Sequence, residues 1–209
     1  MIEAVGNHGV ELLYGSDEIQ GRVHALAAQI TTDYAGREPV LVTVLKGASV
    51  FCADLMLQIG LKARVDFMSI SSYGGAPTPS GVVRIMKDLD QDIAGQHVIV
   101  VEDIVDTGLT MTYLRSVLQD RNPASLEVCT LLDKSVRRIT PLDIRYRGFD
   151  CPDRFVVGYG MDVGERFRNL PFILAVDDPA GLADDPRALL RHLEGEPERG
   201  SVAGPEGTV

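Results

Sequence analysis

Residues 97–112 read HVIVVEDIVDTGLTMT, and this stretch decides the fold. The apolar run at 97–101 is rich in β-branched residues, and its composition and length are typical of a strand buried on both faces of a parallel sheet. The run ends at two adjacent carboxylates, Glu102 and Asp103. A short turn at 106–110 and an amphipathic helix follow. The pattern predicts a ligand site at the carboxyl edge of an open α/β sheet.

The residue types of the turn suit a phosphate group. Gly108 lets backbone N–H groups approach a ligand closely, and Thr107 and Thr110 add hydroxyl donors. The following helix directs its positive end and its free N–H groups toward the same loop. Glu102 and Asp103 would repel a phosphate, but they could bind sugar hydroxyls or ligate Mg²⁺ through oxygen.

The stretch resembles the thirteen-residue signature of the type I phosphoribosyltransferases, in which four apolar residues precede an acidic pair and a D-T-G-x-T loop. The rest of the chain is similar to one branch of that family, the hypoxanthine-guanine phosphoribosyltransferases. Alternatively, residues 102–110 form only a solvated turn at a strand end of some other α/β protein. One departure is Leu109, where some relatives carry lysine, and backbone donors should carry that phosphate contact.

The resemblance implies a fold class and a domain organisation. It implies an α/β, type I phosphoribosyltransferase fold, with a central, mostly parallel sheet flanked by helices, a small hood and a flexible catalytic loop. We expect the phosphoribosyltransferase domain to span residues 1–178. Residues 179–209 are rich in Pro, Gly, Asp and Glu, and we expect an acidic C-terminal tail that is partly disordered.

A second strand-to-loop junction lies at residues 40–49. The apolar run VLVTVL leads directly into Lys46 and Gly47. The segment LKGAS resembles the family's pyrophosphate loop, in which the Leu–Lys peptide can be cis, and the sequence does not decide the state of Leu45–Lys46. An ordinary turn with a solvated lysine is the alternative. The resemblance also assigns a pyrophosphate contact to Arg168, whose planar fork suits phosphate oxygens.

Residues 71–81 are rich in Gly, Pro and Ser, a composition typical of either a functional lid or a long hairpin tip. The segment resembles the family's flexible catalytic loop, in which a Ser-Tyr pair closes over the reacting centre. Here that pair is Ser72 and Tyr73. Closure would exclude water from the activated sugar.

Two further segments resemble the base-binding part of the family. Lys134, at the end of the apolar run 126–132, matches the lysine that donates to the 6-oxo group of the purine. Phe155 would stack on the ring, and the Val156 backbone would read the ring edge. Asp162 would hold a second Mg²⁺. Alternatively, Lys134 is a solvated charge, Phe155 and Val156 are core residues, and Asp162 belongs to a turn.

The implied reaction is transfer of 5-phosphoribosyl from phosphoribosyl pyrophosphate to N9 of hypoxanthine or guanine, giving IMP or GMP and pyrophosphate. Asp106 would act as general base toward the purine, or would only shape the phosphate loop. Magnesium would be held by Glu102, Asp103 and Asp162. The residues implied for phosphoribosyl pyrophosphate are Lys46, Gly47, Glu102, Asp103, Asp106, Thr107, Gly108, Leu109, Thr110 and Arg168.

Composition limits the other possibilities. The chain has 209 residues, 45% of them hydrophobic, which suffices for one α/β domain with at most a small subdomain. A formal net charge of −10 argues against nucleic-acid binding, although a local basic pocket remains possible. No apolar run is long enough to span a membrane, and no signal peptide is evident, so we expect a cytoplasmic protein. Its three cysteines, without CxxC spacing, should be reduced.

Two alternative functions stay open. One is the same chemistry with xanthine, uracil or adenine as the acceptor. The other is a regulator that keeps the fold and binds RNA. A homodimer or homotetramer is expected from the family alone. Arg137 and Arg138, in a predicted loop that continues to Gly148, are expected to face solvent.

Overall fold

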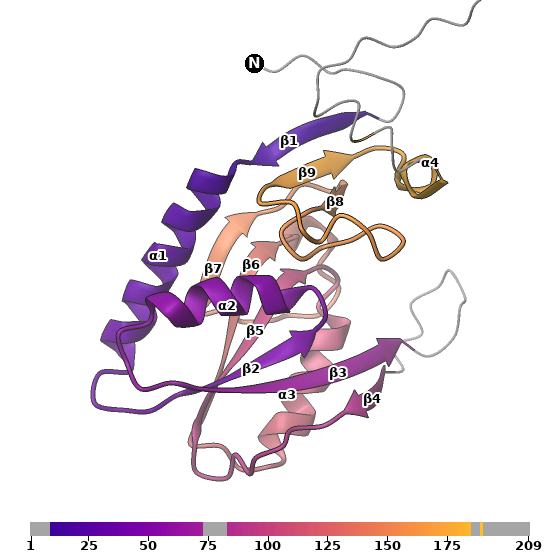
Figure 1. The fold of residues 1–209 in the computed structure, drawn as a ribbon. Coiled ribbons are helices and arrows are strands. Elements are labelled where there is room, and N and C mark those ends of the chain that lie inside the picture. The colour runs from indigo at the N-terminus through magenta and orange to yellow at the C-terminus, as the bar shows by residue number, and fades with distance from the viewer. Residues whose placement is uncertain (1–8, 73–82, 185–188, 190–209) are drawn as a thin grey trace, which may run out of the picture.

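The computed structural model describes residues 9–72, 83–184 and 189, and these form two sheets (Figure 1). The larger sheet contains, in spatial order, β4 (Val83–Lys87), β3 (Arg64–Ser72), β2 (Val40–Leu45), β5 (His97–Val105), β6 (Ser125–Asp133) and β7 (Tyr146–Asp150). Only β4 runs antiparallel to its neighbour, so the sheet is mostly parallel, as predicted.

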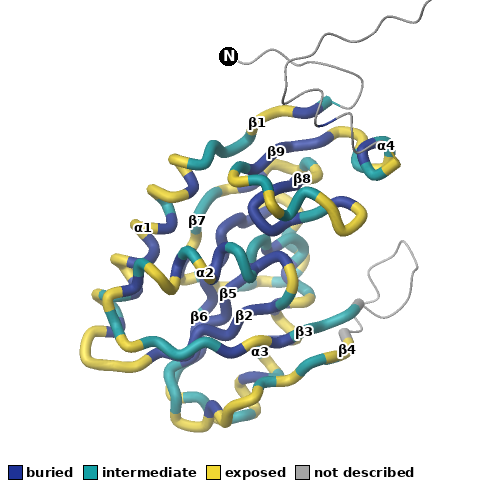
Figure 2. Tube along the Cα trace, viewed as in Figure 1, coloured by how far each residue is buried: buried dark blue, intermediate teal, exposed yellow. Residues whose placement is uncertain are grey.

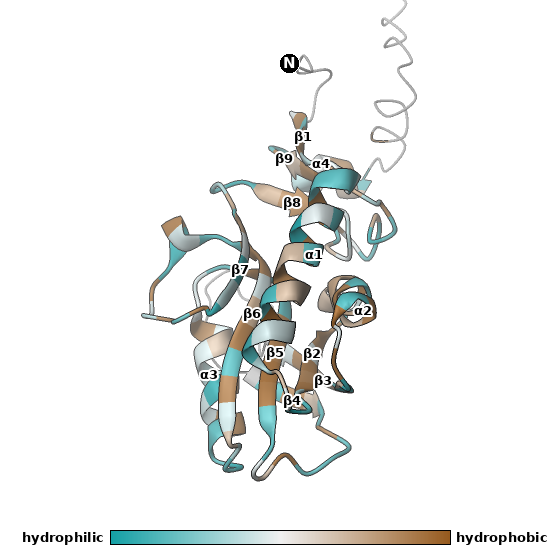
Figure 3. Ribbon diagram, turned by 90° about the vertical axis from the view of Figure 1, so that its left-hand side faces the viewer, coloured by the Kyte–Doolittle hydropathy of each residue, from teal (hydrophilic) through white to brown (hydrophobic). Residues whose placement is uncertain are grey.

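Helices cover both faces of this sheet. The helices α1 (Ser16–Asp33) and α2 (Ala48–Gln58) lie on one face and α3 (Leu109–Gln119) on the other (Figure 3). Alternate residues of β5 divide between the two resulting cores. Ile99 packs with α1 and α2, whereas Val98 and Val100 pack with α3. The central strands are therefore buried on both sides (Figure 2), which confirms the prediction made from their β-branched runs.

The order of the strands determines where a ligand can bind. From β2 the chain crosses over through α2 to β3, on one side of the sheet. From β5 it crosses through α3 to β6, on the opposite side. The loops that leave β2 and β5 therefore diverge at a topological switch point, where open α/β sheets bind their ligands. The two motifs predicted for the diphosphate and the phosphate are these two loops.

The smaller sheet corresponds to the predicted hood. Its antiparallel strands lie in the order β1 (Val10–Tyr14), β9 (Ile173–Val176) and β8 (Phe155–Val157). The short helix α4 (Pro179–Asp184) buries Leu182 in this core, and Leu189 is buried there as well. The first residues of the predicted tail thus pack on the hood. The boundary at residue 178 stays a prediction, and most of the tail lies outside the described residues.

Three expectations about elements need correction. The strand β5 extends to Val105, so the acidic pair lies within it and not after it. Residues 154–162, which resemble the family's base-binding strand, form only the short strand β8, because positive φ angles at Gly158, Tyr159 and Gly160 turn the chain immediately after Val157. The edge strand β7 replaces an expected loop. Its two aromatic residues, Tyr146 and Phe149, do not alternate with polar residues, so the period of two that marks a strand is missing.

Three further predictions concern the cysteines, membrane-spanning helices and the catalytic loop. Cys52, Cys129 and Cys151 are buried free thiols, as predicted. No helix within the described residues is long and apolar enough to cross a membrane. Ser72 ends β3, while Tyr73 and the rest of the predicted catalytic loop to residue 81 lie outside the described residues.

Truncating Leu114 should test the core between α3 and the sheet. This side chain is fully buried, so Leu114→Ala is expected to lower the free energy of unfolding by about 2–5 kcal/mol through lost apolar burial and a residual cavity. Urea denaturation monitored by circular dichroism measures the change. Leu57→Ala is the matched control, because Leu57 is 77% exposed on α2 and should change stability by less than about 0.5 kcal/mol. Equal losses in the two variants would contradict this packing.

Candidate functional site

A cleft of about 570 Å³ lies where the ends of β5 and β6 meet the hood. Its wall contains Asp103, Ile104, Asp106, Lys134, Arg137, Asp153, Arg154, Phe155, Val156, Met161, Asp162 and Arg168. The cleft therefore brings together predicted residues from three distant parts of the chain. They are Asp103, Asp106, Lys134, Phe155, Val156, Asp162 and Arg168.

The predicted phosphate loop connects β5 to α3. Gly108 has a φ of 85° and precedes the helix, which has no side-chain cap at this end. The Leu109 N–H lies 3.4 Å from the Thr107 hydroxyl oxygen, and Thr110 stands in the first turn. A helix N-terminus without a capping side chain leaves backbone N–H groups for a ligand. The local geometry thus suits an anion, although a helix terminus alone does not identify one.

The two adjacent carboxylates have different surroundings. Glu102 is 8% exposed, and burial raises its pKa well above the ordinary value, with a further increase caused by Asp103. Asp103 lines the cleft and accepts a hydrogen bond of 2.7 Å from the Ile104 N–H. Burial raises the pKa of Asp103 to about 6, and the negative charge of Asp162 adds to this shift. Both groups would hold a proton less readily beside a cation.

Gly47 allows the loop after β2 to approach Asp103 closely. A Cβ atom at Gly47 would lie 1.7 Å from Asp103 Oδ2 and 3.3 Å from the carbonyl oxygen of Gly160. A Cβ atom at Gly160 would in turn lie 2.1 Å from the Gly47 carbonyl oxygen. Only glycine fits at this contact between the β2 loop and the hood. The peptide bond between Leu45 and Lys46, which the sequence left undecided, is cis.

Ion pairs connect the same loop to the hood. Lys46 Nζ lies 2.7 Å from Glu165 Oε2, and this contact lowers the pKa of the Glu165 carboxyl. Arg168 lies 2.7 Å from Asp162 and donates a hydrogen bond of 2.8 Å to the Gly160 carbonyl oxygen. Both predicted pyrophosphate-binding cations are thus held by acidic partners near the cleft.

The opposite wall carries the predicted base-binding residues. Lys134 is buried and donates a hydrogen bond of 2.8 Å to the Arg154 carbonyl oxygen, which fixes the position of its ammonium group. Phe155 lines the cleft and is 41% exposed, so part of its ring is accessible from the cleft. Val156 is buried beside it.

Two cleft residues hold buried polar atoms without hydrogen bonds, Asp106 Oδ1 and Arg168 Nε. Asp106 Oδ1 does lie 3.4 Å from Arg137 Nε, at ion-pair distance but without hydrogen-bond geometry. Buried unsatisfied polar atoms are rare in native proteins. Two others among the described residues, Thr43 Oγ1 and Arg64 Nε, lie outside the cleft, whereas Asp106 Oδ1 and Arg168 Nε lie where a ligand could supply partners.

The described residues contain no group of three or more Asp, Glu, His or Cys side chains arranged to hold a metal ion. Magnesium usually binds one or two protein carboxylates and completes its shell with water and phosphate oxygens. Asp103 and Asp162 in the cleft fit that pattern, because a cation would compensate the burial and mutual repulsion of their charges. Glu102 is buried within β5 and is absent from the cleft wall.

The sequence reasoning missed two arginines. Arg137 lines the cleft next to Asp106 and Asp153. The expectation that Arg138 faces solvent is wrong, since its side chain is only 15% exposed and pairs with Asp133. The sequence signal for a functional role of these residues is weak, because it consists of two adjacent arginines shortly after the end of a strand.

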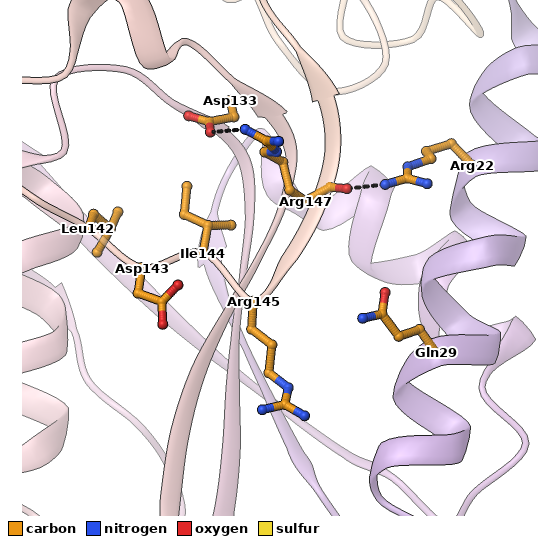
Figure 4. A pocket seen from close by; sticks show the side chains of 8 residues that line it. All are labelled: Arg22, Gln29, Asp133, Leu142, Asp143, Ile144, Arg145 and Arg147. Atoms are coloured by element: carbon orange, nitrogen blue, oxygen red, sulfur yellow. Dashed lines mark hydrogen bonds and ion pairs between the residues drawn. The ribbon is translucent and has the colours of Figure 1, made fainter.

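A second cavity of about 470 Å³ lies on the other side of Asp133, between α1 and β7. Figure 4 shows Arg147 directed toward Asp133, while the backbone carbonyl of Arg147 accepts a hydrogen bond from Arg22. Six of its eight lining residues are polar or charged, and several of these are already paired: Arg22 donates to the Gly148 carbonyl oxygen, and Arg145 pairs with Asp33 outside the lining.

The doubly covered, mostly parallel sheet, with its cleft between the strand ends and the hood, defines an α/β protein with a candidate ligand site at its switch point. Residues 13–163 match the phosphoribosyl transferase domain family. The chain belongs to this family and is a phosphoribosyltransferase enzyme.

Similar proteins cover most of the chain. It is 47% identical to the hypoxanthine-guanine phosphoribosyltransferase of Mycobacterium avium over 172 residues, which cover 79% of this chain and 85% of the relative. It is 46% identical to the enzyme of the same name from Streptococcus pneumoniae, covering 78% and 91%. The crystal structure of a hypoxanthine-guanine phosphoribosyltransferase from Bacillus anthracis superposes with a TM-score of 0.77 at 46% identity, covering 79% and 98%.

Replacing Asp103 with asparagine is expected to stabilise the ligand-free protein at neutral pH. Because the folded pKa of about 6 exceeds the ordinary 3.8, the Asp103 contribution to stability is present below 3.8 and is lost as the pH rises toward 6. Because asparagine cannot ionise, the variant does not lose this contribution to stability as the pH rises. The free energy of unfolding should therefore exceed the wild-type value by about 1–3 kcal/mol at a pH of about 7.5, with a smaller gain at lower pH.

Urea denaturation between pH values of about 5 and 8 measures this difference. Asp143→Asn serves as the control, since Asp143 is an exposed carboxylate away from Asp103, and its replacement should change the free energy of unfolding by less than about 0.5 kcal/mol. A constant or absent gain for Asp103→Asn would contradict the assigned environment of Asp103.

Proposed function

We propose that this enzyme transfers 5-phosphoribosyl from phosphoribosyl pyrophosphate to N9 of a 6-oxopurine, hypoxanthine or guanine, as in purine salvage. The observation that carries the proposal is the cleft. A lysine, an exposed phenylalanine, an arginine and several carboxylates from separate elements face one space of about 570 Å³. The names of the similar bacterial enzymes support the same acceptor class.

The phosphates would bind at the loops of the switch point. Residues Asp106 to Thr110 would hold the 5′-phosphate through backbone N–H groups and hydroxyls, with Leu109 contributing its N–H. Lys46, Gly47 and Arg168 would contact the pyrophosphate, exchanging part of their pairing with Glu165 and Asp162 for phosphate oxygens. Positive groups there would stabilise the charge that develops on the leaving group.

The carboxylates would bind the sugar and the metal. Glu102 and Asp103 are proposed to bind the ribose hydroxyls, directly or through Mg²⁺, and Asp162 a second Mg²⁺. The metal would supply neutralisation of the pyrophosphate charge. Carboxylates near the anomeric carbon would also favour a transition state with oxocarbenium character. Asp106, with its unsatisfied Oδ1, would accept the purine proton at N7 as general base.

Selectivity for a 6-oxopurine follows from the chemistry of Lys134. An ammonium group only donates hydrogen bonds, so it matches the exocyclic 6-oxo group and not the amino group of adenine. The bond to the Arg154 carbonyl holds it in place and leaves further N–H donors for the base. Phe155 would stack on the purine, and the Val156 backbone would read its edge. We further propose that the enzyme works in the cytoplasm as a homodimer or homotetramer.

The first test supplies Mg²⁺ and phosphoribosyl pyrophosphate with each nucleobase in turn and measures pyrophosphate release. Hypoxanthine and guanine should support turnover, and adenine and uracil should not. If xanthine alone supported turnover, the acceptor would be xanthine and not hypoxanthine or guanine. Tight, salt-sensitive binding of RNA together with no turnover would favour the regulator.

Replacing Asp106 with asparagine should test the general base. The variant keeps its shape and its loop but cannot accept the proton, so kcat should fall by about 10²–10⁴-fold with little change in KM for phosphoribosyl pyrophosphate. Steady-state kinetics at saturating base measures this. Wild-type turnover in this variant would remove Asp106 from the chemistry.

Replacing Lys134 with methionine should test the acceptor contact. Loss of a charged hydrogen bond of about 1.5–3 kcal/mol should raise KM for hypoxanthine by roughly 10–150-fold, while KM for phosphoribosyl pyrophosphate changes little. Arg166→Met is a matched control, because Arg166 lies in the hood outside the cleft wall. Equal effects of the two substitutions would contradict the assignment.

A further inference from the structure

Arg138 contacts the backbone of the phosphate loop and is absent from the cleft wall. The Nε atom of Arg138 donates a hydrogen bond of 3.1 Å to the Asp106 carbonyl oxygen, and its Nη2 atom lies 3.5 Å from the Val105 carbonyl oxygen. The next residue along the chain continues this contact, because the Ile139 N–H donates to the Thr107 carbonyl oxygen at 2.9 Å. The carbonyls of the loop residues Asp106 and Thr107 are thereby bound by the segment 138–139, while the carbonyl of Val105, at the end of β5, also accepts a hydrogen bond of 2.9 Å from the Lys134 N–H.

The same side chain forms a wall against Gly108. A Cβ atom at Gly108 would lie 2.8 Å from Arg138 Cδ and 3.0 Å from the Thr140 hydroxyl oxygen. The Thr140 hydroxyl also lies 3.1 Å from that of Thr112 in α3. The segment 138–140 therefore contacts the loop and the first turns of the helix that follows it.

Asp133 holds Arg138 in this position. The two side chains pair through Asp133 Oδ1 and are only 7% and 15% exposed. Asp133 is the last residue of β6, opposite Val105 in the parallel ladder, so a rigid strand end carries the anchor. Its other oxygen, Oδ2, lies 3.5 Å from Arg147 in the cavity of Figure 4. Arg138 itself is absent from the cleft wall.

We propose that Arg138, anchored by Asp133, is a positioning residue for the 5′-phosphate loop. A phosphate is repelled by peptide oxygens and attracted by peptide N–H groups, so the loop binds it only when its carbonyls point away. Arg138 presents five N–H donors in a fixed fork and can bind several of those carbonyls at once. This role rests on the proposed function, since it deepens the assignment of the same loop.

The test compares two ligands that occupy different parts of the site. Arg138→Ala should raise the dissociation constant for ribose 5-phosphate about tenfold or more, the effect of about 1.4 kcal/mol, and leave that for pyrophosphate within about twofold. The KM for phosphoribosyl pyrophosphate should rise with it, while the KM for the base stays constant. Titration calorimetry and steady-state kinetics give these values.

Two other variants separate positioning from stability. Arg138→Lys keeps the charge but has one terminal nitrogen, so it should restore only part of the ribose 5-phosphate affinity. Arg147→Ala removes the other arginine from Asp133 and leaves the loop contacts in place, so it should bind both ligands as the wild type does. Asp133→Asn should weaken ribose 5-phosphate binding selectively, as Arg138→Ala does.

The outcomes distinguish the inference from the function. If the wild type binds ribose 5-phosphate and Arg138→Ala binds it equally well, the positioning role is overturned. Equal loss of both ligands in Arg138→Ala, with a broadened thermal transition, would also overturn it in favour of a purely structural role. If the wild type binds neither ligand and releases no pyrophosphate, the proposed function fails.

Discussion

The burial of β5 on both faces is the constraint on which the rest of the structure depends. The strand pairs with β2 and β6 in parallel, and its side chains alternate between two helix-covered cores. Because β5 is held by two neighbouring strands and by packed cores on both faces, the position of its carboxyl end is fixed. Asp103 and the loop from Asp106 therefore occupy defined positions opposite the ends of the neighbouring strands, which is what a multi-part ligand site requires.

That rigidity has an electrostatic consequence. Asp103 and Glu102 lie where burial disfavours their charge, and both have raised pKa values. Across the cleft, Arg168 is engaged by Asp162, and Lys46 by Glu165. The ligand-free protein thus pairs Lys46 and Arg168 with its own carboxylates, while Glu102 and Asp103 stay poorly solvated. A ligand that brings both phosphates and a metal would improve the surroundings of all these groups, which favours such a ligand over a neutral one.

Features that depend on residues close together in the sequence could be predicted, whereas features that depend on contacts between distant parts of the chain could not. The strands β2 and β5, their loops and the thiol state followed from periodicity, β-branched runs and spacing, because those signals are local. The extension of β5 through its acidic pair, the edge strand β7 and the role of Arg138 did not. Each depends on what lies opposite in space: a paired neighbour for β5, α1 and β6 for β7, and Asp133 with the loop carbonyls for Arg138.

The contact between Arg138 and the loop also changes how a glycine-containing phosphate loop is to be understood. Gly108 has a positive φ, which glycine adopts at little cost, and this alone would explain its presence. However, the side chain of Arg138 fills the space that a Cβ atom would need. Gly108 therefore has two functions: it allows the turn at a positive φ, and it leaves room for the close packing of the Arg138 side chain. A loop whose carbonyls were satisfied by water instead would be free to rotate them toward the anion, and the fixed fork of Arg138 removes that freedom.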